Sequence, residues 1–178
     1  MTTAKHIANQ LLAQQLPRRW RHVQSVAAKA DRLAETLPMP ERPVLVAAAW
    51  LHDIGYSPGL VDTGMHALDG ARWLRANGYD LRVASLVAYH SCAIYEAEER
   101  GLAHVLRDEF LPEETPVSDA LWYSDMTTGP DGQDLTVNER LAEIRQRYGP
   151  NHIVTRFWRR AEPTLRDVVA RAERRQPI

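Results

Sequence analysis

The stretch VLVAAAWLHDIG, residues 44–55, decides the fold of this chain. It is apolar almost all round until it reaches His52 and Asp53, and Pro43 directly before it suits the first turn of a helix. A helix that is apolar on every side is usually buried on every side. The stretch therefore predicts a helix from about Pro43 to Gly55 at the centre of a helical bundle.

The segments on either side of this stretch also show helical periodicity. Between Arg19 and Leu37, apolar residues recur three or four positions apart, as on one face of an amphipathic helix. No convincing strand pattern is present, so the fold class is all-α, a bundle around the central apolar helix. Residues 1–178 are expected to form one domain with its core at about 19–128, an N-terminal helix and a C-terminal helical extension. Further helices are expected over 7–16, 66–76, 80–90, 118–126, 136–148 and 152–174, the last interrupted or kinked at Pro163. The charged segment 96–109 is expected to be more exposed.

The composition excludes several classes of protein. The 178 residues suit one ordinary domain, and a net charge of −1 makes nucleic acid an unlikely partner. No run of 18 apolar residues exists to cross a membrane, and the N-terminus lacks the apolar stretch of a secretory signal. The single cysteine, Cys92, rules out an intrachain disulfide and is expected to be a buried, inert thiol. A cytoplasmic protein is expected, and apolar residues on the terminal helices are compatible with a homodimer.

The pair His52-Asp53 is the strongest chemical signal. A charged carboxylate beside an imidazole, at the end of a segment as apolar as VLVAAAWL, is costly to bury unless it is paired or coordinated. A metal ion would remove that cost. The dipeptide alone is weak, because so short a motif also occurs by chance.

Other expected helices carry further candidate ligands. His22 lies on or beside the apolar stripe of its helix, Asp125 lies near the end of an apolar segment, and His66 and His90 begin and end neighbouring helices. Imidazole and carboxylate together suit one or two divalent transition-metal ions, namely Mn, Fe, Co, Ni or Zn. Helical bundles build such sites from side chains on facing helices.

The order of these residues resembles the ligand pattern of the HD-domain metal-dependent phosphohydrolases. HDIG at residues 52–55 is similar to a common form of that superfamily's central motif, and the resemblance covers about Arg19 to Thr128. It implies a first metal and a second one, with the full ligand set present: His22, His52, Asp53 and Asp125 for the first, and His66 and His90 for the second.

The resemblance also implies roles in catalysis. Asp53 would bridge the two metals, which activate a water to attack phosphorus. Arg19 lies one helical turn before His22, so it shares that face and is the first candidate for a phosphate contact, with Arg18 second. Small bacterial members that cleave dinucleoside tetraphosphates share the Arg-x-x-His start, but they carry a lysine where this chain has Tyr56.

For several residues, the sequence allows either a functional or a structural role. Tyr56 is a candidate substrate contact, as are Tyr89, Tyr95 and Trp122, although aromatic residues in a bundle are more often core. Thr127 and Thr128 follow Asp125 and either meet substrate or make turn contacts. The arginine-rich C-terminal segment favours a solvated helix or a dimer contact over nucleic acid, because acidic residues are interspersed in it. Three histidines fit no ligand pattern and are expected to be surface or packing residues: His6, His104 and His152.

Three functions follow from the sequence, in decreasing order of support. The first is a metal-dependent phosphohydrolase that cleaves a phosphoester or phosphoanhydride of a small phosphorylated molecule, with nucleotides as the first candidates. The second is an HD-fold mixed-valence di-iron oxygenase acting on a small organic or organophosphonate substrate, because the resemblance extends to such proteins with the same six ligands. The third is a non-catalytic metal-binding regulatory module.

Overall fold

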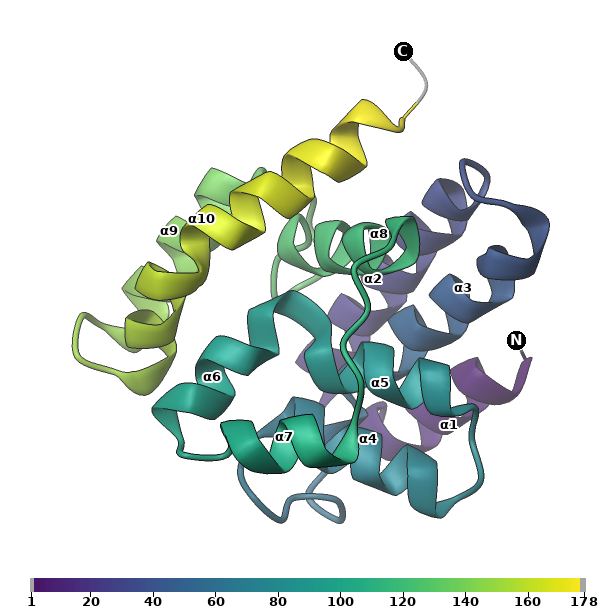
Figure 1. Cartoon of the computed structure of the whole chain (residues 1–178), viewed down its shortest axis with the longest axis horizontal. Helices are drawn as coiled ribbons and strands as arrows, with labels where there is room; N and C mark the ends of the chain where they lie inside the picture. Colours follow the sequence, from purple (N-terminus) through teal and green to yellow (C-terminus); the bar gives the residue numbers. More distant parts are fainter. Residues whose placement is uncertain (1, 177–178) are drawn as a thin grey trace.

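The computed structural model describes residues 2–176, and over this range the chain is an all-α bundle without a β-strand (Figure 1). Three short 3-10 turns, η1 (Met39–Glu41), η2 (Ile54–Tyr56) and η3 (His90–Cys92), connect its helices. The helices are α1 (Thr2–Leu12), α2 (Pro17–Ala34), α3 (Arg42–Leu51), α4 (His66–Ala76), α5 (Leu81–Tyr89), α6 (Ala93–Glu99), α7 (Ala103–Glu109), α8 (Pro116–Met126), α9 (Val137–Tyr148) and α10 (Ile153–Arg174).

The apolar stretch forms the expected central helix. Helix α3 contacts α1, α2, α5 and α8, and its Leu45, Ala48 and Ala49 side chains are fully buried. The helix ends at Leu51, however, four residues before the predicted end. The expectation was wrong because of a close approach to α4: a Cβ added at Gly55 would lie 1.9 Å from the carbonyl oxygen of His66. The chain leaves α3 through a turn, and Asp53 in this turn approaches His66 at the start of α4, 3.5 Å from its Nε2.

Two other segments differ in part from expectation. The charged segment 96–109, expected to be more exposed, forms the end of α6 and all of α7, and its Glu96 and Leu106 side chains are buried. Gly101 adopts a positive φ of 72° between the two helices. An interruption or a kink was expected at Pro163, and helix α10 continues through this residue without interruption. Pro163 lies on the exposed face of α10, where a carbonyl that loses its helical partner can bond to water instead.

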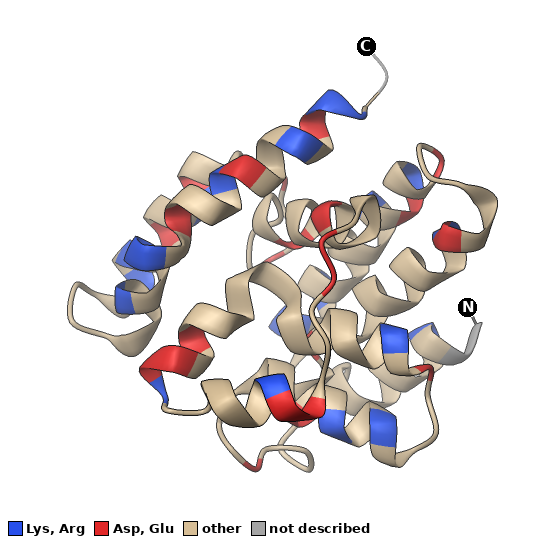
Figure 2. Ribbon diagram, in the orientation of Figure 1, with Lys and Arg blue, Asp and Glu red and all other residues tan. Residues whose placement is uncertain are grey.

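Helices α9 and α10 run side by side at one edge of the bundle and are called the arm below (Figure 1). Their apolar faces form a second buried cluster around Leu141, Phe157 and Leu165. Asp119 on α8 joins the arm to the bundle, since its carboxylate accepts hydrogen bonds from Arg171 and Arg175 at 2.7–2.9 Å. Basic and acidic residues alternate along the outside of α10, which agrees with a solvated helix (Figure 2).

None of the helices in residues 2–176 is both long enough and apolar enough to span a membrane.

Candidate metal centre

The six predicted ligands come together at one place in the bundle. The nitrogen and oxygen atoms that they offer form three overlapping groups, and within each group the atoms lie within 4.8 Å of one another. Five of the six residues are buried and His66 is partly buried. They come from α2, the turn after α3, the first residue of α4, the end of α5 and the last turn of α8: His22, His52, Asp53, His66, His90 and Asp125.

Asp53 lies between the two halves of this cluster. Its Oδ2 atom is 3.3 Å from Nε2 of His52 and 3.7 Å from Nε2 of His22. Its Oδ1 atom lies 3.5 Å from Nε2 of His66, and that nitrogen lies 3.2 Å from Nε2 of His90. The carboxylate thus presents one oxygen to each half, which is the arrangement required of a bridging ligand.

Backbone carbonyls fix the orientation of three of the imidazoles. The Nδ1 atoms of His22, His52 and His90 lie 3.0, 2.8 and 2.6 Å from the carbonyl oxygens of Gly129, Ala49 and Val87. A carbonyl only accepts a hydrogen bond, so each Nδ1 carries a proton and Nε2 is the nitrogen that faces the cluster. This is the second-shell pattern of metal-bound histidine.

The inward-facing atoms require a positive charge between them. Nε2 of His22 lies 3.0 Å from Oδ1 of Asp125, so either a second proton on the ring or a metal ion must lie between these two atoms. Nε2 of His52 is fully buried and has no hydrogen-bond partner among the described residues. Burial lowers the pKa of His52, but the charges of Asp53 and Asp125 outweigh it and raise the pKa to about 9. A divalent cation would satisfy all of these groups at once, so the residues present fit a metal.

Arg19 lies beside the cluster, as the sequence predicted. Its Nη1 donates to Oδ2 of Asp53 at 2.8 Å, and its guanidinium lies 4.1 Å from the ring centre of Tyr56. Tyr56 in turn stacks on His66 with ring centres 4.0 Å apart. Burial raises the pKa of Asp53, but the charges of Arg19 and His52 outweigh it and hold that pKa well below the usual range. Asp53 is therefore ionised at neutral pH.

Asp125 is held by a strained turn. Its Oδ2 accepts a hydrogen bond of 2.5 Å from the hydroxyl of Ser91, so Oδ1 is the oxygen left facing His22. Ser91 and Cys92 both have positive φ angles, 47° and 62°, which non-glycine residues rarely adopt. Cys92 is fully buried, as expected, and burial raises the pKa of its thiol, so it is not a nucleophile.

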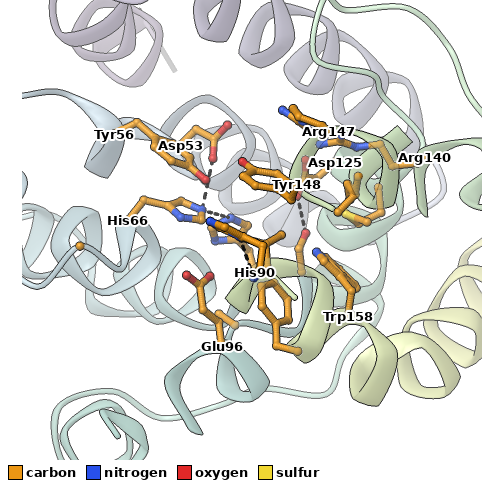
Figure 3. A pocket seen from close by; sticks show the side chains of 18 of the residues that line it. Asp53, Tyr56, His66, His90, Glu96, Asp125, Arg140, Arg147, Tyr148 and Trp158 are labelled. Atoms are coloured by element: carbon orange, nitrogen blue, oxygen red, sulfur yellow. Dashed lines mark hydrogen bonds and ion pairs between the residues drawn. The ribbon is translucent and has the colours of Figure 1, made fainter. Parts of the chain in front are cut away.

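A cavity of about 210 Å³ opens beside the cluster (Figure 3). Asp53, Tyr56, His66, His90 and Asp125 contribute to its lining, as does Arg19. Six further residues outside the arm also line it: Gly64, Ser91, Ala93, Glu96, Arg100 and Met126. The rest of the lining comes from the arm, for which the sequence predicted no role in the site. The arm residues are Arg140, Ile144, Arg147, Tyr148, His152, Val154, Phe157 and Trp158.

No spacing signal ties the arm residues to the ligands. His152, expected to be a surface or packing residue, caps α10 by accepting a hydrogen bond from the backbone of Val154, and it stacks on Tyr148. The only available hint was the presence of basic residues within an amphipathic helix, and that pattern equally describes a solvated surface.

Two predicted substrate contacts are not supported by the structure. The side chain of Arg18 points in a different direction from that of Arg19, because neighbouring side chains on a helix project about 100° apart. Its side chain is exposed and is bonded to Asp131. Thr128 is fully buried and its hydroxyl donates to the carbonyl oxygen of Ser124. Three aromatic candidates line a separate cavity between α8 and α10: Tyr89, Tyr95 and Trp122.

Comparison with known proteins gives one family and one relative of named function. The HD domain family model matches residues 19–144. A tRNA (cytidine(56)-2'-O)-methyltransferase from Picrophilus torridus is 32% identical over 93 residues, which are 52% of this chain and 26% of that protein. The chain thus spans about a quarter of that relative's length. No solved structure matches.

Proposed function

This chain belongs to the HD domain family, and we propose that it is a metal-dependent phosphohydrolase that cleaves a phosphoester or phosphoanhydride of a small molecule. The observation that carries the proposal is the orientation of the histidines. Three rings donate a hydrogen bond from Nδ1 to a backbone carbonyl, so that Nε2 faces the two buried carboxylates: His22, His52 and His90. We further propose that residues 1–178 act as a single HD domain, because the arm supplies part of the cavity wall.

One or two divalent transition-metal ions, Mn, Fe, Co, Ni or Zn, suit the donor set of imidazole and carboxylate. His22, His52, Asp53 and Asp125 would hold the first ion, and Asp53 would share a second with the other two histidines. Such ions make a water more acidic and neutralise charge on a phosphoryl group. Burial lowers the pKa of His66 to about 3, and the charges of His90 and Arg19 contribute, so the ring is neutral and can act as a ligand.

The side chains around the ligands have separate tasks. Arg19 donates one hydrogen bond to Asp53 and lines the cavity. Its remaining N–H groups can therefore bond to a phosphoryl oxygen. The pKa of Tyr56 is raised, mainly by burial, so its phenol stays protonated as it packs between Arg19 and His66. Together these contacts hold Arg19 in one orientation next to Asp53.

The size of the cavity limits what it can enclose. At about 210 Å³ it is smaller than the roughly 300–1,000 Å³ of pockets that hold drug-sized ligands. A phosphoryl group and the atoms next to it fit inside. The base of a nucleotide would have to extend out of the opening, so compact phosphorylated metabolites belong in the screen beside nucleotides.

Metal analysis followed by a phosphatase screen tests the proposal. Full-length protein, purified without added metal, is assayed for bound metals and then for release of inorganic phosphate in the presence of Mn or Co. We expect phosphate release that depends on the metal and is lost in His52→Ala with helical content retained. His104→Ala, which removes an exposed histidine on α7, is the matched control. Metal-bound protein that releases no phosphate from any compound in the screen would contradict the proposal.

The same candidate metal centre is compatible with two alternative functions. The buried second half of the cluster, His66 with His90, is compatible with a mixed-valence di-iron oxygenase. Two irons per chain and oxygen uptake with an organic or organophosphonate substrate would favour that function. The partial match to a tRNA methyltransferase favours the third function, a non-catalytic metal-binding module. In that larger protein the matched segment makes up only about a quarter of the chain.

A further inference from the structure

The arm places two arginines in the wall of the metal cavity. Arg140 and Arg147 lie on α9 and line the cavity together with Tyr148. Figure 3 shows Asp53 and His66 on one side of the cavity and Arg140 and Trp158 on the other. A ligand that reaches the metal centre therefore also meets cationic groups from the arm.

These arginines share a single counter-ion. Nη1 of Arg140 and Nη2 of Arg147 donate to the same oxygen of Glu143, Oε2, at 2.5 and 2.8 Å. The Arg140 side chain is 7% exposed, and its Nε has no hydrogen-bond partner among the described residues. Two guanidinium groups on one carboxylate leave a net positive charge and several unused donors, and an unpaired buried donor costs free energy. An anion on this wall would balance the excess positive charge and bond to the guanidinium donors that face the cavity.

We propose that Arg140 and Arg147 bind a second anionic group of the substrate, such as a carboxylate or another phosphoryl group. The proposal rests on the proposed function, because it takes the phosphoryl group at the metal centre as the first anionic group. It makes the preferred substrate a compact compound that carries an anion at each end. The small volume of the cavity agrees with this class, since a second anion needs far less space than a nucleoside.

The arm also limits the orientation of such a ligand. The guanidinium of Arg147 lies 5.0 Å from the ring centre of Tyr148, and His152 stacks on the same ring at 4.7 Å. Arg147 is thus packed against an aromatic surface that reduces its freedom, and an ordered guanidinium loses less entropy when it binds an anion.

Binding of non-hydrolysable phosphonates tests the inference on the metal-loaded, full-length protein. Calorimetry would compare ethylphosphonate, with one anionic group, with 3-phosphonopropionate and ethylene-1,2-bisphosphonate, which carry a carboxylate or a phosphonate as the second group. We expect the second group to raise affinity at least about tenfold, the effect of one charge-assisted hydrogen bond. The stronger of the two difunctional ligands identifies the anion that the arm prefers.

Three variants on α9 assign the effect to the proposed residues. Arg147→Gln should remove most of the advantage of the second anionic group and leave ethylphosphonate binding unchanged. Glu143→Gln should increase the advantage, because it releases both arginines from their shared carboxylate. Arg145→Gln is the matched control, since Arg145 is paired with Glu162 and is not part of the cavity lining. The Glu143 variant is decisive, because a purely structural ion pair would not give tighter binding when it is broken.

The outcomes separate this inference from the proposed function. If ethylphosphonate binds and the second anionic group gives no advantage, the inference is wrong and the phosphohydrolase proposal stands. Unchanged ligand preferences in both Arg147→Gln and Glu143→Gln would likewise contradict it. If none of the three phosphonates binds the metal-loaded protein, both proposals fall together.

Discussion

The two walls of the cavity differ in how they are built. The ligand wall consists of the six candidate His and Asp ligands with Arg19. Nearly all of its side chains are buried and held by a hydrogen bond to a neighbouring group. The arm wall, formed by residues of α9 and α10, uses side chains from the surface of an amphipathic hairpin, and its arginines are held mainly by Glu143. We infer that the ligand wall sets the chemistry and that the arm wall sets the choice of substrate.

The largest expected effect comes from removing a ligand. His52→Ala should lose bound metal and lower turnover by at least about a hundredfold, since even second-shell substitutions cost about 10–100-fold. Metal content by mass spectrometry and phosphate release would both be measured. His104→Ala should retain metal and activity, and if it lost both to the same extent, the role given to His52 would be wrong.

A smaller effect distinguishes two neighbouring arginines. Arg19→Gln should lower kcat/KM by about a hundredfold, as the loss of one charged donor to the transition state does. Arg18→Gln should change it less than about twofold, because this exposed side chain is bonded to Asp131 outside the cavity. Steady-state kinetics on both variants would decide, and equal losses would contradict the separate roles given to the two residues.

The attachment of the arm should depend on pH. Burial raises the pKa of Asp119, but its hydrogen bonds from Arg171 and Arg175 outweigh this and lower it. A lowered pKa stabilises the folded state above the ordinary carboxyl pKa of about 3.9, and this contribution is lost as the pH falls through the folded-state value. Asp119→Asn should therefore lower the free energy of unfolding by about 1–3 kcal/mol at pH 7.

Urea unfolding at pH 7 and at successively lower pH would measure that change. The difference between wild type and Asp119→Asn should begin to shrink below about pH 4, where the unfolded-state carboxylate takes up a proton, and should vanish below the lowered folded-state pKa. A difference that stays constant down to pH 2 would show that the ion pair is not its source.

The smallest expected effect concerns the start of α10. Replacing His152 with Ala removes the side chain that accepts from Val154 N–H, and this should cost about 0.5–1 kcal/mol of stability. His152→Asn should restore most of it, because asparagine is a favoured N-cap residue. Thermal unfolding of both variants would test this, and an equal loss in both would place the role of His152 elsewhere than in the cap.

The candidate ligands could be named from the sequence because their order resembles the ligand pattern of a known family. Each ligand lies in or beside a helix whose apolar periodicity is readable, and His52-Asp53 follows the most apolar segment of the chain. The end of α3 could not be placed, because the approach of Gly55 to the backbone of α4 is a tertiary contact. Thr128 was misjudged because closeness to Asp125 in sequence does not fix the direction of a side chain.

The arm wall could not be predicted for a related reason. Amphipathic periodicity shows that α9 and α10 each bury one face, and it leaves open which part of the bundle that face meets. In the sequence, Arg140 and His152 look like ordinary surface residues. Only the structure shows that both line the cavity. The sequence contains no spacing that would link them to His90 or Asp53.

The turn at Ser91 and Cys92 has a consequence for engineering this protein. Non-glycine residues in left-handed backbone conformations cost of order 1–3 kcal/mol each, so glycine at position 91 would relax the chain. It would also delete the hydroxyl that occupies one oxygen of Asp125, and the freed carboxylate could then chelate through both oxygens or rotate. A search for thermostable variants would therefore select substitutions at position 91. The more stable variant would hold Asp125 less firmly in the one orientation that the Ser91 hydroxyl now fixes.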